Sequence, residues 1–260
     1  MWTPNDARPL LVVGRQRAGT RFVADGLSSF VGVTIQGELT DIGRDRMVDL
    51  VDGVANYYSK RAASGDPELD KRRGFWEEKK RDLIYHCWYA LSKDQGRLPD
   101  DDCRFYGYKR PGDEHLFDFY ERHLGDQAPI YIYCCRNFRD NYLSIIARWP
   151  GRSIRRVAGF YLQSLRQFRY MKEQAPERVI GFVLDDLQAQ GVEYFQKRVL
   201  DRLGIKPNRQ IMRRLARKEA PNSAVRHGVE KRVDLSRLEY FYLAFKPDLN
   251  EHFEYVRQHG

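Results

Sequence analysis

The chain has 260 residues, and its 42% hydrophobic and 13% aromatic content is enough for one sizeable core, which predicts a single domain over residues 1–260. No apolar run reaches the ~18 residues that a membrane span needs, and the first residues lack the pattern of a secretion signal. We therefore expect a cytoplasmic protein without a transmembrane segment. The formal net charge of +9 favours an anionic ligand.

The four cysteines contain no C-x-x-C pair, so we expect no zinc site. Cys134 and Cys135 are adjacent inside an apparent strand. This arrangement suits buried thiols in a reduced cytoplasm better than a disulfide framework.

The first informative stretch runs from Leu10 to Phe30. The apolar run Leu10–Val13 predicts a buried strand of a parallel sheet, Gly14–Gly19 forms a glycine turn, and the apolar spacing after Thr20 predicts a helix. Strand, glycine loop and helix together direct backbone N–H groups and a helix N-terminus at a phosphate or sulfate. Such a turn is also a common structural device, so the loop alone leaves a purely structural role open.

The spacing of Gly14 and Gly19 matches the nucleotide P-loop, G-x-x-x-x-G-K-[ST], but Thr20 and Arg21 follow where that loop has its lysine and hydroxyl. Without these groups an ordinary ATPase or GTPase is disfavoured. A kinase with a degenerate P-loop stays an alternative, although it lacks both a loop lysine and a magnesium ligand in register.

The loop resembles the 5′-phosphosulfate loop of sulfotransferases, which reads P-R-S-G-T or P-K-S-G-T after a buried strand. The matching residues here are Gln16-Arg17-Ala18-Gly19-Thr20. The proline and the serine of the family pattern are replaced, while the basic residue, the glycine and the threonine stand in register.

The next segments predict the neighbouring part of the sheet and a helical insertion. A short apolar strand, Val33–Ile35, ends just before Glu38, which predicts a carboxylate at the carboxyl edge of the sheet, where open α/β folds hold ligands. Residues 41–62 predict an amphipathic helix, and residues 68–93 predict a highly charged one. We interpret the region of about 66–95 as a helical insertion that either forms a lid over the ligand site or packs as a surface helix.

Residues 104–109 alternate like a strand and end in Lys109. A helix that contains His115 is expected over residues 113–124, and residues 130–135 are the clearest strand after the first.

The stretch from Arg136 to Ser144 resembles the 3′-phosphate motif of sulfotransferases, R-N-P-[KR]-D with a serine eight positions after the first arginine. Arg136 and Ser144 keep this spacing, while Phe138 replaces the proline. An arginine that leaves a strand and a serine one turn into the next helix can converge on one phosphate. An exposed helix start, with Asp140 favouring the helix N-terminus, is the structural alternative.

Further along the chain we expect helices over residues 153–173, 195–203, 208–217, 235–245 and 249–256, and a strand over residues 179–184. Asp185 and Asp186 after this strand resemble the Y-E-D-L ending of the family and are expected to cap the next helix. Arg226 and Gly228 resemble the R-K-G that closes over the 3′-phosphate in cytosolic sulfotransferases. The same segment, residues 222–233, also resembles the V-R-N-x-x-E-L stretch of nodulation-factor sulfotransferases, and Gly37-Glu38-Leu39 resembles their G-E-L after the second strand, so these enzymes are the nearest family in resemblance.

The resemblance implies an α/β fold with a central parallel β-sheet flanked by helices in a P-loop-like, three-layer architecture. It also implies transfer of a sulfuryl group from 3′-phosphoadenosine 5′-phosphosulfate (PAPS; product PAP) to an acceptor hydroxyl or amine. Arg17 would stabilise the leaving phosphate, and no metal is implied because arginines and loop amides supply the positive field. The residues that the resemblance assigns to the cofactor are Arg15, Gln16, Arg17, Ala18, Gly19, Thr20, Arg21, Arg136, Ser144, Arg226 and Gly228.

Three residues compete for the remaining catalytic roles. Glu38 can accept the proton of the acceptor if partial burial raises its pKa, and its alternative role is to cap the helix that follows. His115 is the rival base, with a surface or packing role as its alternative. Lys109 is expected near the sulfuryl group or the acceptor, and is otherwise a solvated lysine.

The acceptor is predicted to be a carbohydrate or a lipid-linked glycan, with a small metabolite as the alternative. The arginine-rich helices leave a second class open, a non-enzymatic basic module that binds nucleic acid or an anionic polymer. The two sulfotransferase-like loops disfavour nucleic acid. A peripheral membrane contact stays open, and the oligomeric state is not predicted.

Overall fold

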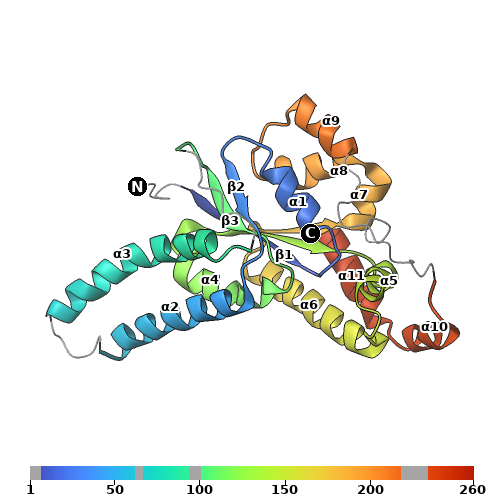
Figure 1. The fold of residues 1–260 in the computed structure, drawn as a ribbon, viewed down its shortest axis with the longest axis horizontal. Helices are drawn as coiled ribbons and strands as arrows, with labels where there is room; N and C mark the ends of the chain where they lie inside the picture. Colours follow the sequence, from blue (N-terminus) through green and yellow to red (C-terminus); the bar gives the residue numbers. More distant parts are fainter. Residues whose placement is uncertain (1–6, 62–66, 94–100, 218–233) are drawn as a thin grey trace.

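A computed structural model of the chain describes residues 7–61, 67–93, 101–217 and 234–260. At its centre lies a sheet of five parallel strands in the order β2-β3-β1-β4-β5 (Figure 1). The strands are β1 (Arg8–Gly14), β2 (Val33–Gln36), β3 (Phe105–Tyr108), β4 (Ile130–Cys135) and β5 (Val179–Val183). The predicted α/β class is confirmed, and the carboxyl ends of all five strands lie at one edge.

Helices connect the strands and cover both faces of the sheet (Figure 1). The α-helices are α1 (Thr20–Leu27), α2 (Asp41–Arg61), α3 (Pro67–Ala90), α4 (Phe117–Leu124), α5 (Phe138–Arg148), α6 (Ile154–Gln174), α7 (Leu184–Gln190), α8 (Val192–Phe195), α9 (Arg209–Arg217), α10 (Arg237–Ala244) and α11 (Asp248–His259). Two 3₁₀ turns, Asp113–Leu116 and Gly125–Gln127, flank α4, and a π-helical turn, Gln196–Leu200, follows α8.

Aromatic side chains fill the space between the sheet and its two helical layers. On one face, Phe22 of α1 and Phe195 of α8 pack against Phe182 of β5. On the other face, Phe168 of α6 lies with its ring centroid 4.9 Å from that of Tyr133 in β4. The strands are buried on both faces by these layers, which is why β1 and β4 read as continuous apolar runs.

The helices α2 and α3 form a long pair between β2 and β3 (Figure 1). The C-terminal half of α3 belongs to the core, because Ile84, Tyr85 and Trp88 are fully buried. The Trp88 ring lies 5.0 to 5.8 Å from the rings of Tyr85, Tyr108 and Tyr120. The N-terminal half of α3 is largely exposed, so the pair projects away from the sheet. The lid role expected for the region of about 66–95 stays a prediction, and residues 66, 94 and 95 lie outside the described ranges.

The expected helix over residues 113–124 begins one turn later than the sequence predicts. Residues Asp113–Leu116 form a 3₁₀ turn, and regular α-helix begins at Phe117. Asp113 and Glu114 are both buried in this turn. In a regular α-helix on the surface, two consecutive side chains would not both point into the core. The tighter 3₁₀ turn lets Asp113 and Glu114 both do so, and their buried polar contacts are described below.

We expect Trp88→Ala to lower the free energy of unfolding by about 3–5 kcal/mol, because it removes a large side chain from a closed aromatic cluster. The matched control is Phe75→Ala on the same helix, at a side chain that is 64% exposed, which should change the value by no more than about 0.5 kcal/mol. Urea unfolding followed by circular dichroism measures both. Equal losses for the two variants would contradict the division of α3 into a core half and an exposed half.

Candidate anion-binding site

The loop between β1 and α1 leaves the sheet at a point where only glycine fits. Gly14 has a φ of +112°, and a Cβ there would lie 2.2 Å from the carbonyl oxygen of Cys134 in β4. Gly19 at the other end has a φ of +91°, and Arg17 between them also has a positive φ, 66°. The loop is therefore a tightly constrained turn, as expected where a backbone must present its N–H groups to a ligand.

Three hydrogen bonds from other elements fix the loop in place. The N–H of Gly14 donates to Glu114 Oε2 at 3.1 Å, and the Gly14 carbonyl accepts from the N–H of Gly112 at 2.8 Å. Asn141 of α5 donates its side-chain amide to the carbonyl of Gln16 at 2.7 Å. These contacts hold the loop between the β3–α4 connection and α5.

The loop leads directly into α1, and both Ala18 of the loop and Thr20, the first residue of the helix, are buried. The cap residue of this helix is Gly19, and no side chain of the described residues caps it. The first-turn N–H groups thus face the same region as the arginines described next, an arrangement that attracts an anion.

Three arginines meet beside this loop. Arg17 donates from Nε to Ser144 Oγ at 3.0 Å, Arg136 lies at the end of β4, and Arg148 lies one helical turn after Ser144 on α5. Burial, and then the charges of Arg148 and Arg136, lower the pKa of Arg17. Like charges held this close repel one another, so the cluster favours a bound anion.

Two of the guanidinium donors in this region are buried without an acceptor. The Nε atoms of Arg15 and Arg136 have no hydrogen-bond partner among the residues that the structure describes. Arg136 does bond through Nη2 to Asp140 at 3.1 Å. Since buried donors are normally satisfied, the orphaned Nε atoms indicate a group that completes the site when it binds.

The start of α5 is tied to the start of α7 rather than left free. The N–H of Asn137 donates to Asp185 Oδ2 at 2.8 Å, and its side chain caps α5 by accepting from the N–H of Asp140 at 2.9 Å. The expected capping role of Asp185 is wrong: α7 has no side-chain cap, and Asp185 instead fixes the backbone beside Arg136. The second acid, Asp186, pairs with Arg257 at 2.7 Å.

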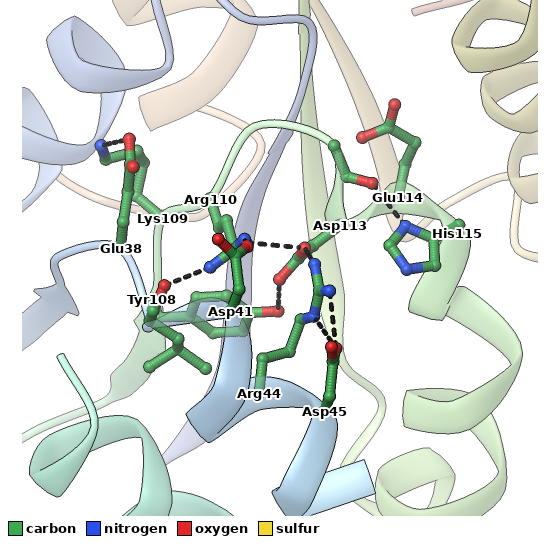
Figure 2. A network of polar contacts seen from close by, with 12 residues as sticks. Glu38, Asp41, Arg44, Asp45, Tyr108, Lys109, Arg110, Asp113, Glu114 and His115 are labelled. Atoms are coloured by element: carbon green, nitrogen blue, oxygen red, sulfur yellow. Dashed lines mark hydrogen bonds and ion pairs between the residues drawn. The ribbon is translucent and has the colours of Figure 1, made fainter. Parts of the chain in front are cut away.

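Glu38 and Lys109, which the sequence analysis treated separately, form an ion pair (Figure 2). Lys109 Nζ donates to Glu38 Oε1 at 2.7 Å, and Lys93 Nζ lies 3.9 Å from Oε2. The side chain of Glu38 is 36% exposed, whereas that of Lys109 is only 12% exposed. The lysine therefore orients a carboxylate that solvent and a ligand can still reach.

A buried network next to this pair holds the Glu38 segment against the sheet edge (Figure 2). Asp113 accepts hydrogen bonds from Arg44 Nη1 at 3.0 Å and from the Tyr108 hydroxyl at 2.7 Å, and it forms an ion pair with Arg110, whose Nε lies 3.0 Å away. Arg110 also binds Asp41 and the Leu39 carbonyl. Burial raises the pKa of Asp113, against the lowering effect of Tyr108 and the two arginines.

The other predicted site residues lie apart from these contacts or outside the described ranges. His115 is exposed, and its Nδ1 contacts the Gly112 carbonyl at 2.5 Å within its own turn. The side chain of Arg21 lies on the surface, 3.7 Å from Asp25. Arg226 and Gly228 fall in residues 218–233, outside the part of the chain that the structure describes.

Sequence reasoning missed three residues that build this site. Glu114 and Asn141 fix the loop from elements that are remote in sequence, and no local pattern marks them. Arg148 does carry a local signal, since it follows Ser144 by four positions and therefore shares its face of α5.

Within the described ranges, no group of three or more His, Cys, Asp or Glu side chains could hold a metal ion. Among the same residues, no helix is long and apolar enough to cross a membrane. The four cysteines are free thiols.

No protein-family model matches the chain, and no curated protein matches it. Among solved structures, sulfotransferase STF9 from Mycobacterium avium is similar with a TM-score of 0.52 and 13% identity, over 96% of this chain and 76% of that one. The sulfotransferase domain of the Synechococcus PCC 7002 olefin synthase aligns over 92% and 94% of the two chains, with a TM-score of 0.48 and 15% identity. The similarity to STF9 shows that the chain has a sulfotransferase fold. The narrower resemblance to nodulation-factor enzymes stays a prediction.

The buried Glu114 predicts a pH-dependent contribution to stability. Burial raises its pKa above the ordinary 4.5, although hydrogen bonds from Ser164 and Gly14 oppose the shift. The folded state then holds the proton more tightly than the unfolded chain, so stability from this group is complete below pH 4.5 and is lost as pH rises through the folded-state pKa. Relative to Glu114→Gln, the free energy of unfolding of the wild type should fall over this range. Urea unfolding at a series of pH values measures it, and a rising difference would contradict the assignment.

Proposed function

We propose that the protein is a sulfotransferase that uses PAPS as its donor. The observation that carries the proposal is the loop with its arginines: the charges of Arg136 and Arg148 act on Arg17, and the buried Nε donors of Arg15 and Arg136 lack acceptors among the described residues. The sulfotransferase fold supports the same activity. PAPS carries a phosphosulfate and a 3′-phosphate, and both anionic groups can accept charge-assisted hydrogen bonds from these arginines.

The residues divide between the two ends of the donor. The loop amides from Ala18 to Thr20 and the guanidinium of Arg17 would hold the phosphosulfate end at the start of α1. Arg136 and Ser144 would hold the 3′-phosphate. Arg226 and Gly228, outside the described residues, keep the role that the sequence resemblance implies. The structure supports this division through the contact between Arg17 and Ser144, which brings the two groups side by side.

The chemistry breaks the bond between sulfur and the bridging oxygen of the 5′-phosphate and forms one from sulfur to the acceptor oxygen or nitrogen. Negative charge then grows on the departing phosphate, and Arg17 with the loop amides stabilises it. The acceptor loses a proton, and Glu38 is the group we propose to take it. Lys109 acts as a positioning residue, because its ion pair holds the Glu38 carboxylate in place.

We take a carbohydrate or a lipid-linked glycan as the acceptor, with a small metabolite as the alternative. The support is the sequence resemblance rather than any contact in the fold, because sulfotransferases share the donor half and vary the rest. The free thiols of the four cysteines support the cytoplasm as the location of the protein.

The donor site can be tested by calorimetric titration with PAP. We expect Arg136→Ala to weaken binding by about 2 kcal/mol or more, because it removes a charged contact from a partly buried site. Arg21→Ala is the matched control: it removes a neighbouring arginine whose side chain lies on the surface against Asp25 and leaves the backbone amide in place. A folded wild type that gives no heat with PAP would overturn the proposal, as would equal losses from both variants.

The base can be tested by transfer of radioactive sulfate from PAPS to a panel of glycans and small hydroxyl compounds. Glu38→Gln should lower kcat by about 100-fold or more, because proton abstraction contributes at least that much, while PAP binding stays unchanged. His115→Asn should leave kcat within about twofold, since His115 is exposed and engaged with its own turn. The reverse pattern would assign the base to His115.

A further inference from the structure

Helix α10 presents an apolar face to solvent. Leu238 is 82% exposed, and Phe241 and Phe245 are 66% and 67% exposed. Their spacing of three and four positions puts them on one side of the helix. The rings of Phe241 and Phe245 also contact each other, with centroids 4.9 Å apart. We call these three residues the α10 face. Solitary exposed apolar residues are common, but three large ones on one side of a helix, beside one hollow, mark an interaction surface.

The α10 face borders a shallow hollow at the start of α6. The hollow has a volume of about 380 Å³, and the α10 face lines it together with Ile154, Arg155, Glu239, Tyr242 and Lys246. Most of the lining side chains are apolar or aromatic, and Arg155 and Lys246 add positive charge. This combination matches an amphiphile with an apolar body and an anionic group.

The segment that runs from α5 through most of α6, beside the hollow, carries only positive charge. Residues 141–172 contain six arginines and one lysine, and no aspartate or glutamate. Arg152, Arg155 and Arg156 at the start of α6 are exposed. None of these three forms an ion pair with another described residue, and Arg156 lies over the ring of Phe160 at 5.8 Å. Arginines that cluster on one surface create a positive potential, which attracts an anionic partner.

The acidic residues of the α10 segment are already engaged. Glu239 accepts hydrogen bonds from Tyr142 at 2.6 Å and from Ser236 at 2.9 Å. Asp234 pairs with Arg139 at 3.0 Å. These contacts fasten the segment to α5, and Asp234 is neutralised by Arg139, while Glu239 keeps its negative charge at the rim of the hollow.

We propose that the α10 face and the arginines of α6 dock the protein on a membrane surface that contains anionic lipids. Arginines bind the lipid phosphates while Leu238, Phe241 and Phe245 enter the region between headgroups and acyl chains, the division found in interfacial helices. Nucleic acid is the less suitable partner, because a leucine and two phenylalanines at the tip of the surface would stay in water beside a phosphate backbone. The docking does not depend on the transfer chemistry.

The test is co-sedimentation of the full chain with vesicles of phosphatidylcholine alone or with about 30% phosphatidylglycerol, at low and high salt. The wild type should bind the anionic vesicles and not the neutral ones, and added salt should weaken binding. Phe241→Ser should reduce binding about tenfold or more through lost apolar contact. The double variant Arg152→Glu with Arg155→Glu should reduce it at least as much.

Matched controls lie on other parts of the surface. Phe75→Ser on α3 removes a phenylalanine of nearly equal exposure, 64%. Arg213→Glu with Arg214→Glu reverses two exposed arginines of α9. Each control should keep vesicle binding within about twofold of the wild-type value. All variants should keep their affinity for PAP, because none removes a residue assigned to the donor.

Three results would overturn the proposal. The first is a wild type that does not bind anionic vesicles at low salt. The second is a control that loses as much binding as the variants of the α10 face. The third is binding of single-stranded nucleic acid, or dimer formation measured by light scattering, that Phe241→Ser abolishes while vesicle binding is unaffected.

Discussion

The geometry of the candidate site depends on one close approach of backbones at the centre of the sheet. A Cβ at Gly14 would lie 2.2 Å from the Cys134 carbonyl oxygen, and the same oxygen accepts the N–H of Arg15 at 3.0 Å. With the φ of Gly14 at +112°, this contact turns the chain out of the sheet toward α5. The direction of the loop amides and the contact between Arg17 and Ser144 follow from that turn. Backbone sterics at Gly14, rather than interactions among the charged side chains, therefore determine the positions of the loop amides and of Arg17.

The charges in turn oppose folding unless an anion is present. Arg17, Arg136 and Arg148 repel one another, and burial adds a desolvation cost that salt in the solvent screens poorly. The nearby acids offset only part of this cost, because Asp140 is shared between Arg136 and Arg139 and Asp185 is engaged by Asn137. Hydrogen bonds around the loop, from Glu114 and Asn141 above all, hold the arginines in this arrangement. A fold that keeps like charges together against their repulsion is built for a ligand of opposite sign.

The features of the site that could be predicted from the sequence are those formed by residues close together in the chain. The buried strand before Gly14, the loop, and the spacing of Arg136 and Ser144 are local, and each was readable from adjacent positions. Glu114 reaches Gly14 across 100 positions and Asn141 reaches Gln16 across 125, so neither contact leaves a periodic trace. Asp185 follows a strand as a capping residue would, but the competing donor that engages it, Asn137, comes 48 positions earlier. Pairings of this kind are decided by the order of strands in the sheet, which one sequence does not specify.

Helix α5 links the two basic surfaces of the molecule. Asn141 and Ser144 face the loop, while Tyr142 on the same helix binds Glu239 of α10. Both contacts start from a helix with seven buried residues, so α5 cannot shift without disturbing the core. The anion site and the α10 face therefore keep a fixed distance and orientation, and the positive potentials of the loop arginines and the α6 arginines add.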